Sequence, residues 1–166
     1  MLIVSAAMTE RGRHLFTEFS LMVVATVIGS LAAGARPIDD VRAEEHYNRG
    51  VNFLKANRAE LAIAEFTMSI ELRPKEVDTH LNLGNAYAAN RQIPEAIKAW
   101  ETCVQMDPNY PRAHFNLATI FKTRQQYRQA LDYYKSYVSL IGMDSQEVKK
   151  INAIMSDLRE KLRQVP

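Results

Sequence analysis

Three histidines repeat at a spacing of 34 residues and are the side chains that most suggest metal chemistry. They are His46, His80 and His114, and histidine is the commonest metal ligand in proteins. A period of this length is typical of stacked helical hairpins, in which equivalent residues of successive units lie about one helix diameter, roughly 10 Å, apart. Two nitrogens that share a zinc ion lie within about 4 Å of each other. The spacing therefore predicts packing roles for these histidines and no metal site.

The other reactive side chains form no catalytic motif. The sequence has no glycine-rich phosphate loop and no serine, cysteine or lysine in a nucleophile motif. Its single cysteine, Cys103, cannot form an internal disulfide and is expected in a helix seam. Carboxylate pairs at Asp39-Asp40 and Glu44-Glu45 are expected at a helix start, where acidic groups complement the helix dipole. We predict no enzyme activity and no cofactor; a carrier of a small ligand or metal, using the histidine and asparagine columns, remains the alternative from another class.

A second repeated column, made of asparagines, is a better candidate for binding. Asn48, Asn82 and Asn116 each follow a repeated histidine by two residues, which is about 200° around a helix. They are expected on the inner face, away from the packing seam, and Asn85 shares that face. A carboxamide donates and accepts hydrogen bonds, so a row of them can hold the backbone of an extended peptide. The alternative is that asparagine is a soluble residue that a helix tolerates at this place.

The elements that position these columns repeat with the same period. The units 43–76, 77–110 and 111–144 align without gaps, and each is expected to form two helices. In the middle unit, residues 90–92 interrupt the helical apolar spacing and Pro94 suits the first turn of the next helix. The pattern predicts an all-α fold in which small residues lie where helices touch and aromatic residues fill the space between them. These two columns are Gly50, Gly84 and Ala118, and Phe66, Trp100 and Tyr134.

The columns resemble the tetratricopeptide repeat (TPR). The middle unit is the closest match, and the matching residues are His80, Leu83, Gly84, Tyr87, Ala96, Trp100, Cys103 and Pro108. The outer units depart at Arg49, in the column of Leu83, and at Gly142, where the others have proline. Over residues 43–144 the resemblance implies a right-handed α-solenoid of TPR helical hairpins that holds a protein or peptide partner on its concave face. The implied partner-binding residues are Tyr47, Asn48, Val51, Asp78, Leu81, Asn82, Asn85, Arg112, Phe115, Asn116 and Thr119.

Two classes of partner fit the sequence poorly. The TPR subclass that clamps an acidic C-terminal tail needs basic residues and asparagine in fixed columns, and only Arg112 matches; Tyr47, Val51 and Asn116 occupy other clamp columns. Nucleic acid is not expected, because the aromatic residues belong to helix seams and the domain lacks a strongly basic stripe.

Charge is unevenly distributed along the chain. Residues 36–107 hold nine basic and twelve acidic residues, whereas residues 108–166 hold ten basic and five acidic ones. This polarity suits the orientation of an acidic partner, but a solvated outer helix face is the more ordinary origin of such a distribution.

Residues 145–166 are expected to form a capping helix. Asp144 and Glu147 resemble a capping box, and the apolar stripe is Val148, Ile151, Ile154, Met155, Leu158 and Leu162. An amphipathic terminal helix covers the end of a repeat array and keeps it soluble. A binding helix for another partner is the alternative.

Residues 1–35 have the features of a signal peptide or an N-terminal membrane anchor. Arg11 and Arg13 precede fifteen uncharged residues at 21–35, and Ala33-Gly34-Ala35 offers a cleavage site. The run is shorter than the roughly 20 residues of a membrane span, while the long segment before it keeps a tether through residues 19–35 open. Both interpretations predict export of the repeats, either periplasmic-type or anchored to the membrane, after a linker at 36–42. With a retained anchor, the adaptor becomes an assembly factor for a membrane or envelope complex.

Overall fold

The computed structural model describes residues 38–142 and 146–164, and all elements in these ranges are α-helices. The helices are α2 (Ile38–Lys55), α3 (Ala59–Leu72), α4 (Val77–Ala89), α5 (Ile93–Met106), α6 (Pro111–Thr123), α7 (Tyr127–Ile141) and α8 (Gln146–Gln164). The all-α helical-repeat fold is thus confirmed for the described part of the chain. The predicted signal peptide or anchor at 1–35 lies outside the described residues, and so does Asp144 of the expected capping box. None of the described helices combines the length and apolarity needed to cross a membrane.

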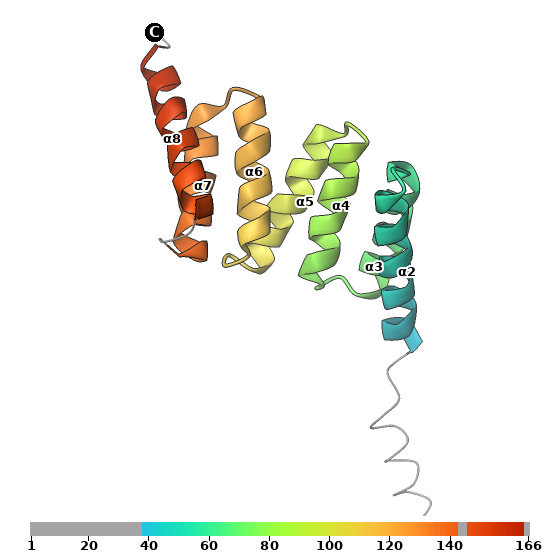
Figure 1. The fold of residues 1–166 in the computed structure, drawn as a ribbon. Coiled ribbons are helices and arrows are strands. Elements are labelled where there is room, and N and C mark those ends of the chain that lie inside the picture. The colour runs from blue at the N-terminus through green and yellow to red at the C-terminus, as the bar shows by residue number, and fades with distance from the viewer. Residues whose placement is uncertain (1–37, 143–145, 165–166) are drawn as a thin grey trace, which may run out of the picture. The chain divides into compact units, whose positions relative to one another are not determined.

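Consecutive helices form antiparallel hairpins, α2–α3, α4–α5 and α6–α7, and α8 packs on α7 (Figure 1). The chain divides between Val41 and Arg42, and the fold described here is that of the part from Arg42 onward. Before that division the structure describes only 38–41. These residues form the first turn of α2, so the described part of the linker predicted at 36–42 is helical. Asp39 and Asp40 stabilise a helix start at this place because they lie next to its positive dipole end.

The three hairpins turn in the same way. Asn57, Arg91 and Gln125 adopt left-handed backbone conformations with φ of 57°, 62° and 58°. The next residue in each turn donates its N–H to a carbonyl five residues back, at 2.9 Å in all three hairpins. This is a helix C-cap geometry that glycine or asparagine adopts most easily, and only the first hairpin has such a residue. The turns are therefore set by the packing of the two helices more than by local sequence.

The predicted seam columns are confirmed by the packing between the helices of each hairpin. A Cβ at Gly50 would lie 2.7 Å from the Phe66 ring, and a Cβ at Gly84 would lie 2.4 Å from Nε1 of Trp100. Phe66 is completely buried, and Trp100 is 5% exposed. The first helix therefore needs glycine at these two positions so that the aromatic ring of the second helix can lie against its backbone.

A second seam column ties each of the first two repeats to its own first residue. Ser69 Oγ donates to the carbonyl of Ala43 at 2.8 Å, and Cys103 Sγ donates to the carbonyl of Val77 at 3.6 Å. Burial raises the pKa of the Cys103 thiol to about 12, so the thiolate that would react does not form near neutral pH. This confirms Cys103 as a packing residue. Its counterpart Tyr137 donates its hydroxyl to Glu147 of α8 at 2.5 Å, so the third repeat uses the same column to hold the cap.

Candidate functional site

Four polar side chains on the first helices of the repeats form a chain of hydrogen bonds, which we call the ladder. Asn82 Nδ2 donates to the hydroxyl of Tyr47 at 3.0 Å, linking α4 to α2. Asn85 Nδ2 donates to Asn82 Oδ1 at 3.4 Å, and Asn116 Nδ2 on α6 donates to Asn85 Oδ1 at 2.9 Å. The ladder thus runs across all three repeats. Two of the predicted asparagine-column residues and Asn85 are brought together by the fold, while Asn48 lies exposed beside Tyr47.

The ladder also reaches into the core. Trp100 Nε1 donates to Asn85 Oδ1 at 3.2 Å and to the backbone carbonyl of Leu81 at 3.3 Å. Asn85 Oδ1 therefore accepts from both Trp100 and Asn116, which uses both of its lone pairs. The sequence alone gave no sign that Asn85 supports the buried indole, because the tryptophan belongs to a seam column. Asn85 thus has a structural role besides any contact with a partner.

The ladder keeps hydrogen-bonding capacity for a ligand. A carboxamide has two N–H donors and two acceptor lone pairs. Asn116 spends one donor in the ladder and Asn82 spends one donor and one lone pair. All three asparagines are partly buried, with exposure between that of core and surface residues. With respect to the described residues, each therefore has one N–H left, and Asn116 has its whole carbonyl oxygen. An extended peptide backbone can satisfy this pattern of donors and acceptors.

A cluster of charged and polar residues lies beside the ladder at the junction of α4 and α6. The hydroxyl of Tyr110 donates to Asp78 Oδ1. Burial, followed by the hydrogen bond and the charge of Asp78, raises the pKa of Tyr110 to about 12, although Arg112 lowers it. Asp78 and Arg112, both predicted site residues, are exposed. Tyr110 was not predicted, since it precedes α6 and belongs to no repeated polar column.

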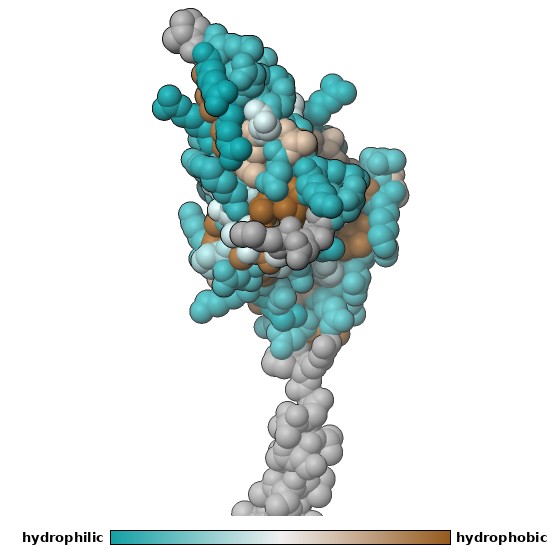
Figure 2. Space-filling view, turned by 60° about the vertical axis from the view of Figure 1, so that its left-hand side comes forward, coloured by the Kyte–Doolittle hydropathy of each residue, from teal (hydrophilic) through white to brown (hydrophobic). Residues whose placement is uncertain are grey.

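Two cavities flank the ladder. The first, about 190 Å³, lies between α2, α3 and the start of α4, and is lined by Ala43, Glu44, Tyr47, Asn48, Ser69, Arg73, Glu76, Asp78 and Thr79. The second, about 570 Å³, lies between α6, α7 and α8, and is lined by Phe115, Thr119, Lys122, Tyr134, Gln146, Glu147, Lys150, Ile151 and Ile154. The predicted residues Phe115 and Thr119 thus border a cavity that α8 helps to form. Figure 2, which brings the α8 side forward, shows hydrophobic surface only in patches between hydrophilic side chains.

Leu81 does not belong to this face, and its prediction as a binding residue is wrong. It is 3% exposed and packs in the core with Ala96 and Trp100. It precedes Asn82 by one residue, which is 100° around the helix, and this rotation turns it into the seam. Val51 is partly buried and packs against the cluster formed by Phe66 and its neighbours, so it offers a partner less surface than predicted.

The histidine column holds loops and helices together. His80 Nε2 lies 3.0 Å from the carbonyl oxygen of Pro74, and His114 Nε2 lies 2.9 Å from that of Pro108. An N–H at Nε2 can donate to these carbonyls, so each histidine fastens the loop that leads into its own repeat. Among the described residues, no group of three or more His, Cys, Asp and Glu side chains is placed to hold a metal ion.

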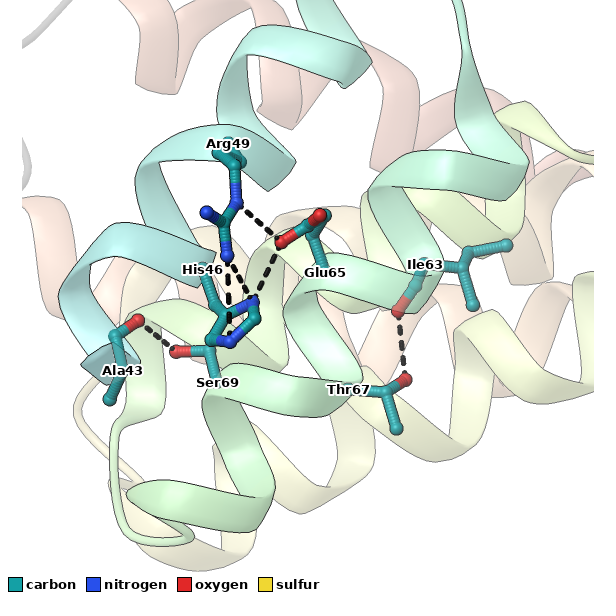
Figure 3. A network of polar contacts seen from close by, with 7 residues as sticks. All are labelled: Ala43, His46, Arg49, Ile63, Glu65, Thr67 and Ser69. Carbon is teal, nitrogen blue, oxygen red and sulfur yellow. Dashed lines mark hydrogen bonds and ion pairs between the residues drawn. The ribbon is translucent and has the colours of Figure 1, made fainter. Parts of the chain in front are cut away.

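His46 has a different partner because the helix α2 continues before it and no loop carbonyl is available. Its Nδ1 lies 2.8 Å from Glu65 Oε2 on α3 and 2.7 Å from Nη2 of Arg49 (Figure 3). Arg49 Nε donates to the same Glu65 oxygen at 2.9 Å. In any one tautomer Nδ1 can donate to Glu65 or accept from Arg49, but not both. The cluster is therefore an ion-paired clasp between α2 and α3.

The sequence was compared with protein-family models and with curated protein sequences. A family model described as tetratricopeptide repeat matches residues 81–146. No curated protein sequence matches the chain.

Solved structures of similar fold include three repeat domains. The TPR2B domain of yeast Sti1, in a complex with an Hsp70 peptide, is 21% identical with a TM-score of 0.65, and the match covers 73% of this chain and 98% of that one. The first TPR domain of Spaghetti (RPAP3), bound to the HSP90 peptide SRMEEVD, is 16% identical with a TM-score of 0.66, covering 76% and 100%. The Yersinia enterocolitica type III secretion translocator chaperone SycD is 19% identical with a TM-score of 0.67, covering 73% and 86%. At these identities the likeness establishes the fold.

Proposed function

We propose that this chain, which is a tetratricopeptide-repeat protein, is an adaptor that holds an extended segment of a partner protein against the ladder. The observation behind the proposal is the unspent hydrogen-bonding capacity of Asn82, Asn85 and Asn116, which lie on the first helices of the second and third repeats. An extended peptide presents backbone donors and acceptors at regular intervals. Side-chain amides can satisfy these groups without requiring a particular peptide sequence. The role needs no catalytic group from the chain.

The structural relatives support a peptide partner but not the same peptide. Two of them are complexes with Hsp70 or HSP90 peptides, and the bound HSP90 peptide ends in Glu-Glu-Val-Asp. In this chain Asn116 occupies a column where such a clamp has a basic residue, and Asp78 adds a carboxylate beside the ladder. Like charges would repel an acidic tail at this place. We therefore propose a partner segment that is not strongly acidic where it meets α2 and α4.

Selection from a random displayed peptide library against the full chain tests the adaptor role. The selected peptide is then titrated calorimetrically into the wild type and Asn116→Ala. Asn116 is the best residue to remove, because Asn85 still accepts from Trp100 in its absence. Loss of one or two hydrogen bonds of about 1 kcal/mol each weakens binding by roughly tenfold.

Asn152→Ala is the matched control, since Asn152 is an exposed asparagine on α8 outside the ladder. Its peptide affinity should equal that of the wild type. The adaptor role is contradicted if the library yields no binding peptide, or if Asn116→Ala binds the selected peptide as tightly as Asn152→Ala does.

We further propose that the repeats act outside the cytoplasm, as an exported or membrane-tethered domain. The support is the sequence of residues 1–35, in which two arginines precede an uncharged run. If the tether is retained, an assembly factor for a membrane complex is the form of adaptor that we favour. Fusion of alkaline phosphatase after Pro166 tests export, and sequencing of the mature N-terminus distinguishes cleavage before Arg36 from retention. An inactive fusion that stays in the cytoplasm would contradict the proposal.

A further inference from the structure

We propose that the cavity between α2, α3 and α4 is a subsite for one basic side chain, lysine or arginine, of the bound peptide. This inference rests on the proposed function, because it concerns the same ladder and names one feature of its ligand. Such a subsite gives this face a preference for positive charge, which is opposite to that of a TPR clamp for an acidic tail.

The lining of the cavity has an excess of negative charge. The described lining residues include three carboxylates, Glu44, Glu76 and Asp78, and one guanidinium, that of Arg73. Arg73 Nη2 pairs with Glu76 Oε2 at 2.5 Å, and the three carboxylates of the lining outnumber its one guanidinium. Glu44 and Asp78 come from different helices and are both exposed. A cationic side chain entering from the ladder would therefore meet carboxylates on two walls.

Neutral polar groups at the cavity add to its affinity for a donor. Thr79 lines the cavity and is completely buried, and its Oγ1 has no hydrogen-bond partner among the described residues. A buried hydroxyl without a partner costs free energy, which a ligand that supplies a hydrogen bond can recover. The hydroxyl oxygen of Tyr47 accepts from Asn82, and its ring forms another part of the wall. An aromatic face attracts ammonium and guanidinium groups.

The electrostatic environment of Tyr47 agrees with this reading of the cavity. Burial raises the pKa of Tyr47, and the charge of Asp78 raises it further, with a smaller contribution from Glu76. The hydrogen bond from Asn82 and the charge of Arg112 act in the opposite direction without cancelling the rise. Among the charged groups, Asp78 thus has the largest effect on the pKa of Tyr47, ahead of Arg112 and Glu76.

The cavity is large enough to hold the end of a long side chain. Its volume of about 190 Å³ corresponds to about six water molecules at roughly 30 Å³ each. A guanidinium or ammonium head with its adjoining methylene groups fits this space, and Tyr47, where the ladder begins, lines the cavity. A basic residue of the peptide can enter here while the following backbone passes along Asn82, Asn85 and Asn116.

The test uses the peptides selected against the full chain. A basic residue should be enriched at one position of the selected peptides. The tightest peptide is then compared with its neutral analogue, in which citrulline replaces that arginine or norleucine replaces that lysine. Against the wild type the neutral analogue should bind about tenfold more weakly. Against Glu44→Gln/Asp78→Asn the two peptides should bind within about twofold of each other, because the carboxylates that distinguish them are gone.

The matched control is Glu45→Gln/Glu71→Gln, which removes the same charge from exposed residues of α2 and α3 outside the cavity. It should retain the tenfold preference for the charged peptide. Circular dichroism establishes that both double variants keep the helical content of the wild type. Selected peptides without an enriched basic residue, or a preference unchanged in Glu44→Gln/Asp78→Asn, overturn the subsite and leave the adaptor role intact. Failure to select any peptide overturns the proposed function itself.

Discussion

The first and third repeats follow the same period but differ in what packs against them. Between Arg42 and Gln164, hairpin α6–α7 has α5 on one side and α8 on the other, and its aromatic residues join a core that includes Ile151 and Leu158. Hairpin α2–α3 packs in a smaller cluster around Phe66. Leu61 and Met68 on α3 remain 38% and 46% exposed. The burial of a side chain and the residues it packs against thus depend on which repeat it belongs to as much as on its position within the repeat.

The same comparison explains where the columns change their partners. The histidine of the third repeat fastens the loop before it, whereas His46 has no such loop and pairs with Glu65. The seam residue of the first repeat, Ser69, bonds within its own hairpin, whereas Tyr137 reaches across to the cap. His46 and Tyr137 thus differ from the equivalent residues of the other repeats because the element next to them is not another repeat. For His46 it is the start of α2, and for Tyr137 it is α8.

Replacement of the buried aromatic residue by alanine should lower the free energy of global unfolding most in the third repeat. Tyr134 is 1% exposed and Phe66 is completely buried, so either change to alanine leaves a large cavity that costs about 3–5 kcal/mol. In a repeat array, an end repeat can open without the rest. Tyr134→Ala should therefore lower the free energy of global unfolding by about 4 kcal/mol, as measured by urea denaturation, and Phe66→Ala should mainly open α2–α3.

Amide hydrogen exchange distinguishes these two responses. In Phe66→Ala, amides of α2 and α3 should lose protection while those of α6 and α7 keep it. In Tyr134→Ala, protection should fall throughout the repeats. Equal loss of protection in all helices of Phe66→Ala would contradict the difference between the two ends.

The repeat period was sufficient to predict the scaffold from the sequence. Gly84 and Trp100 could be paired because a small and a large residue recur at fixed offsets, and the structure places them in contact. The period could not show that Asn85 accepts from Trp100, because that bond depends on how the indole rotates within the seam. The period also could not predict the cavity that Thr79 lines, because the lining residues come from three elements and do not share a position in the repeat.

The two seam glycines should differ in how well they tolerate a methyl group. A Cβ at Gly84 would lie 2.4 Å from Trp100 Nε1, whose hydrogen bonds to Leu81 and Asn85 fix the ring. A Cβ at Gly50 would lie 2.7 Å from the Phe66 ring, which has no polar group to hold it. Gly84→Ala should lower the free energy of unfolding by about 2 kcal/mol. Gly50→Ala should cost less, because ring movement and a helix-propensity gain of about 1 kcal/mol offset the crowding.

Urea denaturation of the two variants checks this order. Ala118, the third member of the column, is the internal reference, since the third repeat already has a methyl group there. If Gly50→Ala destabilises the protein as much as Gly84→Ala, the hydrogen bonds of the indole do not determine the tolerance.

Alkaline pH should weaken the attachment of the cap to the third repeat. Burial, then the hydrogen bond to Glu147 and its charge, raises the pKa of Tyr137 to about 12 from 10.0. Below pH 10 both folded and unfolded chains keep this proton, so the stabilisation is fully present. Between pH 10 and 12 the unfolded chain loses the proton and the folded chain retains it, so stability falls as pH rises.

The pH dependence can be assigned to Tyr137 by a phenylalanine substitution. Between pH 9.5 and 11.5, the free energy of unfolding of Tyr137→Phe should decrease less steeply than that of the wild type. Tyr110, whose pKa is also raised to about 12, continues to titrate in this variant and keeps part of the slope. If the free energy of unfolding falls equally steeply with pH in the wild type and in Tyr137→Phe, the Tyr137 hydroxyl does not contribute to the pH dependence of stability.

The smallest effect is expected at the clasp of the first repeat. Burial raises the pKa of Glu65, but hydrogen bonds from His46 and Arg49 and their charges outweigh it, so this pKa is lowered from 4.5. The stabilisation is therefore present above pH 4.5 and is lost as pH falls through the lower folded value. The Glu65 side chain is 20% exposed and that of Arg49 is 48% exposed, so solvent screening limits the cost of Glu65→Gln to about 1 kcal/mol.

Asp157→Asn on α8 is the control for this last prediction, because Asp157 and Lys161 form an ion pair with side chains 59% and 47% exposed. Such an exposed pair contributes little to stability, because solvent screens the two charges. Since an end hairpin opens locally, the effect of Glu65→Gln should appear as faster amide exchange in α2 and α3 at pH 7, and the difference from wild type should shrink as pH is lowered toward 3.5. The same exchange rates in α2 and α3 for both variants would mean that the clasp adds no more than a surface ion pair, and that hydrophobic packing around Phe66 alone holds the first hairpin closed.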